Sequence, residues 1–213
     1  QILDIIERQA EESGIPRDDF LRFAYIETGG RFDPNASNRS GAKGLFQFVP
    51  DTAQDYGISG REFDPVVNTR AAAALYSDNL SDITRRQARS GHDFLSGNET
   101  PSGLDLYLAH QQGAAGYASI QNAIEGGEFT RTNTRRKILN NISEIDVVRL
   151  TGRAYADLRS LDDRELATTF SQYWNTKYAA ISIPDRGIQA GQPDGAVRER
   201  TSPLADGVLQ NGE

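Results

Sequence analysis

The sequence predicts a mainly α-helical protein, and three observations point to this class. Apolar residues recur at helical spacing in successive segments, as Phe20, Phe23 and Ala24 do at i, i+3 and i+4. Glycine or proline stands where these segments begin or end, as expected of helix boundaries. The 213 residues suffice for one compact domain with an extension, or for one larger domain.

Two helices are expected at the N-terminus. Residues 1–13 carry an amphipathic stripe, and Gly14 can end this helix. Pro16 then holds its predecessor extended and breaks the chain direction. The second helix covers residues 18–27, and the glycine pair at 29–30 offers good residues for its C-terminus.

Glu27 is the only acid on the apolar stripe of this second helix. It falls at i+7 from Phe20 and lies in the last helical turn. Partial burial and the negative end of the helix dipole both disfavour a carboxylate, so this group should stay protonated near neutral pH, as a general acid must. A lone glutamate near a helix end is more often a solvated surface residue, so the helix pattern alone leaves both interpretations open.

The middle of the chain carries turn and cap residues that separate further helices. Asp64 is interpreted as an N-terminal cap in preference to a catalytic base, and Thr100 as a cap with Pro101 in the first turn. Residues 31–40 are expected to form a loop, and the polar stretch 81–103 a helix end with a loop. We expect helices over 50–56, from 64 to about 80 or beyond, from 101 to about 113, and from 116 to about 126.

The C-terminal part differs in composition. A start resembling a capping box at 160–163 precedes an aromatic stripe at near-helical spacing, which more often packs on a domain or a neighbouring chain than binds sugar. From residue 184 onward, apolar residues become sparse, and we expect a polar linker or tail. The stripe comprises Leu161, Leu166, Phe170, Tyr173, Trp174 and Tyr178.

Three segments stand at a spacing that is typical of one family: ETGGRFDPNA at 27–36, SGAKGLFQF at 40–48 and PDTA at 50–53. They resemble the lytic transglycosylase domain of the goose-type lysozyme superfamily, which carries a catalytic Glu-Ser, a Gly-Leu-Met-Gln segment and a Pro-x-Thr-Ala helix start. Thr28 replaces the usual Ser and Phe46 the usual Met. The resemblance covers roughly residues 1–142 and implies a lysozyme-like fold of the soluble lytic transglycosylase type.

The resemblance also implies site residues. Glu27 would be the catalytic acid, Gln47 would hydrogen-bond the substrate, and the residue matching Ser40 would lie close to the acid and help to orient it. In the family, the segment that matches residues 44–47 lines the saccharide cleft. This segment consists of Gly44, Leu45, Phe46 and Gln47.

LAHQQG at 108–113 aligns with the family's Ala-Tyr-Asn-Ala-Gly segment, in a form that looks like the variant of phage and phage-derived members. We interpret His110 and Gln111 as cleft-wall donors that hold N-acetyl groups. A structural role for His110 as a cation at the helix C-terminus is the alternative.

Residues 133–138 occupy the place of a further family segment, Glu-Thr-x-x-Tyr-Val, whose Tyr faces the acid in many members. Lys137 replaces that Tyr if the register holds. Three explanations stay open: the register is off, Tyr107 or Tyr117 fills the gap, or the site differs here. Tyr107 is included among the substrate-binding candidates.

The composition excludes several classes of function. Cysteine is absent, only two histidines occur and no cluster has metal-ligand spacing, so a metal enzyme is not expected. The family resemblance likewise implies no organic cofactor. The formal charge of −7 argues against nucleic acid as the main partner. The sequence contains no apolar run long enough for a membrane span and no signal peptide, and its start at Gln1 without any Met suggests a piece of a longer protein.

By this resemblance the chain should cut the bond between N-acetylmuramic acid and N-acetylglucosamine with one acid, Glu27, and produce 1,6-anhydro ends. Ordinary glycosidases need two carboxylates. The alternatives are a hydrolytic muramidase of the same fold, chitin cleavage, or an inactive wall-binding module of a virion or secretion machine. The expected partners are peptidoglycan strands and other proteins of such a machine.

We expect a phage virion protein that opens the wall of the bacterial periplasm during DNA entry, with a secretion-system or free periplasmic enzyme as the alternative. The expected organisation is a catalytic domain at 1–142, a helical extension at 143–183 and the polar tail at 184–213.

Overall fold

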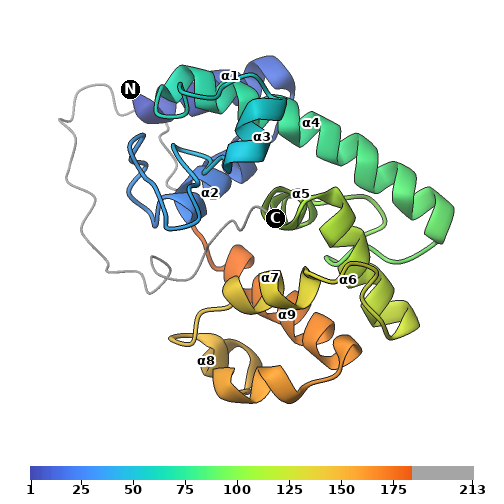
Figure 1. The fold of residues 1–213 in the computed structure, drawn as a ribbon. Coiled ribbons are helices and arrows are strands. Elements are labelled where there is room, and N and C mark those ends of the chain that lie inside the picture. Colours follow the sequence, from blue (N-terminus) through green and yellow to red (C-terminus); the bar gives the residue numbers. More distant parts are fainter. Residues whose placement is uncertain (184–213) are drawn as a thin grey trace.

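A computed structural model describes residues 1–183, and helices make up most of this part of the chain (Figure 1). No strand forms among these residues, in which only two isolated bridges join Ser37 to Lys43 and Lys43 to Phe48. The prediction of a mainly α-helical protein is therefore confirmed. The helices are α1 (Ile2–Ser13), α2 (Arg17–Glu27), α3 (Pro50–Asp55), α4 (Pro65–Ser90), α5 (Gly103–Gln112), α6 (Ala114–Gly126), α7 (Thr134–Asn140), α8 (Val147–Thr151), the 3₁₀ helix η1 (Tyr155–Ser160) and α9 (Asp163–Ala179).

Helix α5 lies at the centre of the structure, in contact with α2, α4, α6 and α9 (Figure 1). Every residue from 104 to 112 is buried. A helix that is covered on all sides needs no single apolar stripe, which is why α5 shows weaker periodicity than α1. The elements around α5 thus hold its side chains in fixed positions.

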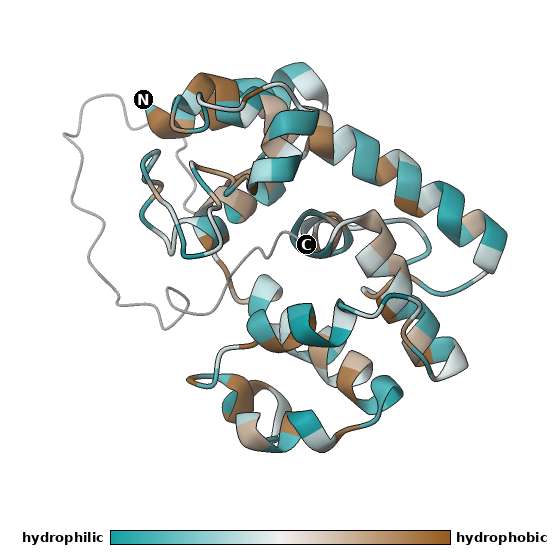
Figure 2. Cartoon of the chain, viewed as in Figure 1, coloured by the Kyte–Doolittle hydropathy of each residue, from teal (hydrophilic) through white to brown (hydrophobic). Residues whose placement is uncertain are grey.

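Helices α1, α2 and α4 pack together on one side of α5. Gly14 adopts a left-handed conformation at the end of α1, as predicted. Asp64 caps α4 by accepting from the backbone N–H groups of Val66 and Val67, which confirms its capping role. Helix α4 runs to Ser90, and its C-terminal half is mainly hydrophilic (Figure 2).

Helix α9 packs against α6, α7 and α8 and also touches α5. The expected packing role of its aromatic stripe is confirmed, because the rings of Phe170, Tyr173 and Trp174 are fully buried. The indole Nε1 of Trp174 donates to the carbonyl of Asn141 over 2.9 Å. This bond attaches α9 to the segment that follows α7.

A buried ion pair strengthens this attachment. Lys177 and Asp146 are each 2 % exposed in their side chains, and Nζ of Lys177 lies 3.2 Å from Oδ2 of Asp146. The hydroxyl of Tyr173 donates to Oδ1 of Asp146 over 2.6 Å and accepts from Nζ of Lys177 over 2.7 Å. Removing one partner alone would leave an uncompensated buried charge.

Two predicted helix starts are wrong. Ser102, not Thr100, is the N-cap of α5, because Asp105 stands at N3 and completes a capping box with Ser102. Asp162, not Ser160, caps α9 by accepting from the N–H of Glu165. The predicted polar tail from residue 184 lies outside the described residues.

Candidate active site

Glu27 is the last residue of α2 and is 7 % exposed. The chain directly after it is fixed by Thr28, whose hydroxyl donates to the carbonyl of Ala24 over 2.7 Å and accepts from the N–H of Phe32 over 2.8 Å. Phe32 itself has a positive φ of 49°. This turn redirects the chain away from Glu27 and ends the helix there.

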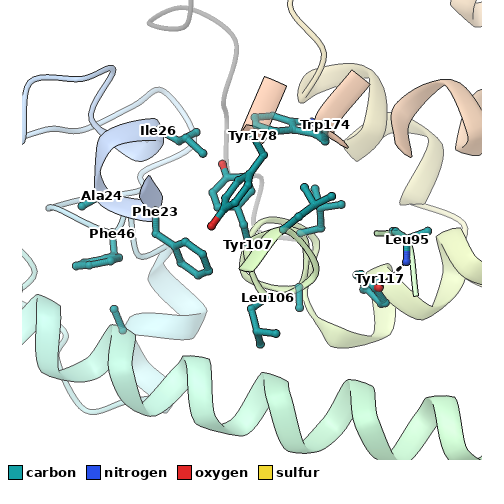
Figure 3. Packing of buried hydrophobic residues seen from close by; sticks show 14 of the residues in the cluster. Phe23, Ala24, Ile26, Phe46, Leu95, Leu106, Tyr107, Tyr117, Trp174 and Tyr178 are labelled. Atoms are coloured by element: carbon teal, nitrogen blue, oxygen red, sulfur yellow. Dashed lines mark hydrogen bonds between the residues drawn. The ribbon is translucent and has the colours of Figure 1, made fainter. Parts of the chain in front are cut away.

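Tyr107 reaches the acid from α5. Its hydroxyl donates to Oε1 of Glu27 over 3.0 Å. The Tyr107 ring lies between Phe23 of α2 on one side and Trp174 and Tyr178 of α9 on the other, with centroid distances of 5.4, 5.2 and 6.0 Å (Figure 3). Three helices therefore determine where this hydroxyl group points.

Tyr107 remains a hydrogen-bond donor at any ordinary pH. Burial, followed by the charge of Glu27, raises the pKa of Tyr107 well above its usual value of 10, and the nearby Gln111 amide offsets this only in part. Tyr117, the second tyrosine that could fill this place, is occupied elsewhere: its hydroxyl donates to Asp105 and accepts from the N–H of Leu95. Of the two, Tyr107 is the residue that contacts the acid.

Position 44 accepts only glycine, because the backbone conformation and the neighbouring atoms leave no space for a side chain. Its φ is +85°, and a Cβ atom there would lie 2.1 Å from the carbonyl oxygen of Glu62 and 2.3 Å from Nδ2 of Asn68. Asn68 donates to that carbonyl over 2.8 Å and accepts from the N–H of Phe46 over 2.9 Å. Gly44 thus makes room for the Asn68 side chain, and Asn68 holds the loop in place.

Asn68 is a residue of the site that the sequence patterns do not reveal. It stands at the end of an Asp-Pro-x-x-Asn sequence at 64–68 that also fits the family, but this sequence reads most simply as a helix start. The one sequence signal for the burial of Asn68 is its position four residues before Ala72, which places both residues on the same, buried face of α4.

The other predicted residues of the 40–48 loop are mostly directed inward. Gln47, with a positive φ of 50°, donates through Nε2 to the carbonyls of Ala36 and Gly44, so its amide hydrogens serve the loop itself. Leu45 and Phe46 are fully buried. Ser40 is half-buried, and its N–H donates to Oδ1 of Asn38; its proposed orientation of Glu27 stays a prediction.

The contacts of His110 agree with the alternative of a structural role at the end of α5, but its lowered pKa argues against the positive charge on which that alternative is based. Burial lowers the pKa of His110 to about 4. The hydrogen bond with the carbonyl of Phe46 raises the pKa, but by less than burial lowers it. That bond spans 2.9 Å from Nε2. His110 therefore joins α5 to the 40–48 loop, while its ring contacts Phe23.

A cavity of about 250 Å³ opens beside His110 and Gln111. Glu27 and Tyr107 are not among its lining residues, but the side chain of Gln111, which lines it, also interacts with the Tyr107 hydroxyl. Its walls come from the loop after Phe46 and from α3, α4, α5 and α7. The lining residues that carry charge are Asp51, Asp55 and Lys137.

Five carboxylates follow Glu27 in the sequence up to the start of α4; four have structural roles or face the cavity, and the fifth, Glu62, is buried outside the cavity lining. Asp64 caps α4, and Asp33 accepts from the N–H of Asn35. Asp51 and Asp55 are exposed and lie on the wall of the same cavity as Gln111. They are the two carboxylates of this group that line the cavity together with His110 and Gln111.

The family model of the transglycosylase SLT domain matches residues 4–122, which is more than half of the chain. The matched span contains Glu27, the 44–47 loop, Asn68 and Tyr107, and it ends before Lys137. No curated protein and no solved structure matches the chain. Within residues 1–183, every helix is too short or too polar to cross a bilayer.

Proposed function

Because the chain belongs to the transglycosylase SLT domain family, we propose that it is an active peptidoglycan lytic transglycosylase with Glu27 as its general acid. The family has the lysozyme-like fold, which agrees with the mainly helical structure, and implies peptidoglycan as the substrate class. The observation that carries the assignment of the acid is the bond from Tyr107 to the buried Glu27 inside the matched span.

The proposed reaction starts from protonated Glu27. It donates its proton to the glycosidic oxygen between N-acetylmuramic acid and N-acetylglucosamine, and the bond from this oxygen to C1 breaks. The 2-acetamido oxygen of the muramoyl sugar forms a bond to C1 in its place. Tyr107 donates to the carboxyl group throughout, so the acid keeps its orientation when it loses the proton.

The second step regenerates the acid. The Glu27 carboxylate takes the proton of the C6 hydroxyl, O6 bonds to C1, and the acetamido oxygen leaves C1. The product is a 1,6-anhydro sugar, water is not consumed, and Glu27 ends protonated as it began. One carboxylic acid suffices for this route, because the acetamido oxygen and then O6 attack C1, whereas ordinary glycosidases use two carboxylates.

The test is digestion of purified murein sacculi in water enriched in heavy oxygen, followed by mass analysis of the muropeptides. The proposal predicts anhydro ends that carry no heavy oxygen. Reducing ends that carry one heavy oxygen atom would show hydrolysis instead and would contradict the proposed mechanism.

Hydrolysis by the same fold is the second candidate, and the observation that favours it is the position of Asp51 and Asp55 on the cavity wall. One of these carboxylates would then activate water. This candidate predicts hydrated reducing ends from the wild type and their loss in the double variant Asp51→Asn with Asp55→Asn, and reducing ends released by both proteins at the same rate would exclude these two residues as the base. An inactive wall-binding module, the remaining candidate, would release no product in any variant.

We propose that the enzyme is a virion component that opens the wall of the bacterial periplasm during phage DNA entry; a secretion machine or a free periplasmic enzyme is the alternative. The Ala-His-x-x-Gly sequence at 109–113, which resembles phage-derived members, supports this setting. Mass spectrometry of purified virions and of the periplasmic fraction of the host would show which compartment contains the protein.

A further inference from the structure

Lys137 stands out among the charged residues near the candidate site. It lies in α7, is only 8 % exposed, and lines the 250 Å³ cavity as well as a neighbouring hollow whose charged lining also includes Asp78, Asp82, Arg86 and Arg131. Among residues 1–183, no carboxylate forms an ion pair with its ammonium group, in contrast to the buried Lys177, which pairs with Asp146. A buried cation without a counter-charge is costly, so its retention calls for an explanation.

The surroundings of Lys137 destabilise its charged ammonium form, which an anion would stabilise. Burial, and then the positive charges of Arg131 and Arg136, lower the pKa of Lys137. All three influences disfavour the charged form of Lys137. An anion that enters the cavity would reverse them, because it would supply the missing counter-charge in a place where water screens it poorly.

Two acids on the cavity wall, and Asp78 and Asp82 on the neighbouring hollow, oppose an anion, but they count for less. Asp78 is exposed, and Asp82 forms ion pairs with Arg85 and Arg86. Asp51 and Asp55 are exposed, so solvent and salt screen their charges. Lys137 is buried, and its charge acts over a short distance in a less polar environment. At about 250 Å³, the cavity is smaller than most ligand sites, and it suits a carboxylate group of the substrate better than a whole glycan strand.

We propose that Lys137 binds a carboxylate of the peptidoglycan substrate and makes the site selective for carboxylate-bearing glycan. This inference rests on the proposed function for the identity of the substrate. The shared chemistry has two sources in peptidoglycan: the lactyl group of a muramoyl sugar without its peptide, and the carboxylates of an attached peptide stem. Glycan made only of N-acetylglucosamine has neither.

The experiment measures dissociation constants by calorimetry with the full chain carrying Glu27→Gln, which prevents turnover. The three ligands are a murein tetrasaccharide with peptides, the same tetrasaccharide without peptides, and chitotetraose. Lys137→Gln should weaken binding of at least one murein ligand by about tenfold to a hundredfold, as expected for a charge-assisted hydrogen bond, and leave chitotetraose unchanged. The murein ligand that is affected identifies the source of the carboxylate.

Arg136→Gln is the matched control, because it removes the same charge from the adjacent, exposed residue of α7. It should change none of the three constants by more than about twofold, as is usual for an exposed charge. Lys137→Gln should also be at least as resistant to urea as its parent, since it removes an unpaired buried charge. This second measurement separates loss of the site from loss of the fold.

The outcomes distinguish this inference from the proposed function. Equal constants for Lys137→Gln and its parent, equal weakening for all three ligands or for Arg136→Gln, or no binding of either murein ligand would overturn the carboxylate site. If Lys137 controls murein binding but the wild type releases no anhydro product, the site stands and the proposed activity fails. If anhydro products form while Lys137→Gln binds normally, the activity stands and the site fails.

Discussion

The hydroxyl of Tyr107 donates a hydrogen bond of 3.0 Å to Oε1 of Glu27, although the two residues stand 80 positions apart in the sequence. The bond joins the C-terminal end of α2 to the central helix α5. Because α5 is buried on all sides, the packing of the core determines the position of the proposed acid. The position of Glu27 therefore depends on the packing of the hydrophobic core.

Replacing Tyr107 by Phe should lower the rate of murein cleavage by about tenfold to a hundredfold, because Glu27 would lose a fixed donor while the ring packing remains. The free energy of unfolding should fall by no more than about 1.5 kcal/mol, the net contribution of one hydrogen bond. Initial rates on soluble murein strands, together with urea denaturation, check both values. An unchanged rate would show that this bond does not matter for catalysis.

Gly44→Ala should destabilise the protein far more than Gly57→Ala. Both glycines have positive φ, which costs about 1–2 kcal/mol for another residue. A Cβ atom at Gly44 would also lie 2.1 Å from the carbonyl of Glu62, whereas nothing lies within 4 Å of one at Gly57. We expect a loss of about 3 kcal/mol or more at Gly44.

Urea denaturation of the two glycine variants measures this difference directly. Since the backbone strain is shared, the difference between them reports the close approach of Asn68 and Glu62. Equal losses in the two variants would mean that the loop can move away at little cost, and that Asn68 does not hold it as described.

His110 should make stability depend on pH between about 6.5 and 4. Burial lowers the pKa of His110 from 6.5 to about 4, so in this range the unfolded chain binds a proton that the folded protein does not. Stability due to this group is fully present above pH 6.5 and is lost as the pH falls. The loss approaches about 3 kcal/mol near pH 4.

The matched variant for this prediction is His110→Gln, which can still donate to the carbonyl of Phe46 but does not titrate. Urea midpoints of the wild type and the variant, taken from pH 7.5 to pH 4.5, give the difference that His110 causes. The wild type should lose stability more steeply than the variant toward low pH. Parallel curves would contradict the buried, neutral state of His110.

Removing one partner of the ion pair between Lys177 and Asp146 should lower the free energy of unfolding strongly, whereas replacing both partners by uncharged residues should lower it much less. Asp146→Asn alone should reduce the free energy of unfolding by about 3–5 kcal/mol, because it leaves a buried ammonium group without its counter-charge. Adding Lys177→Met should restore much of the loss, since no buried charge then remains. Thermal denaturation of both variants tests this; a double variant no more stable than the single one would refute it.

Several elements of the fold could be predicted because their signals are local. The helix ends at Gly14 and Gly113, the cap at Asp64 and the aromatic stripe of α9 all depend on residues within a few positions of one another. The predicted start of α5 is wrong because two cap residues stand close together in the sequence and each fits the local pattern. Thr100-Pro101 is a plausible cap by itself, and only the reciprocal bond with Asp105 favours Ser102.

The candidate site was less predictable because its contacts cross the chain. Tyr107 and Tyr117 were equally plausible partners of Glu27, and nothing local separates two tyrosines on successive helices. The role of Asn68 depends on Glu62 and Phe46, which reach it from two different segments. A cationic His110 is plausible at a helix end, but burial removes the charge, and burial is a property of the assembled helices.

The most direct test of the central claim is the release of 1,6-anhydromuropeptides from murein sacculi by the wild type and by Glu27→Gln. Glutamine keeps the size of the side chain and can still accept from Tyr107, so thermal denaturation should show the variant to be folded. The account predicts anhydro products from the wild type and a loss of at least about a hundredfold in the variant. Anhydro products formed by the folded variant at the wild-type rate would show that Glu27 is not the acid.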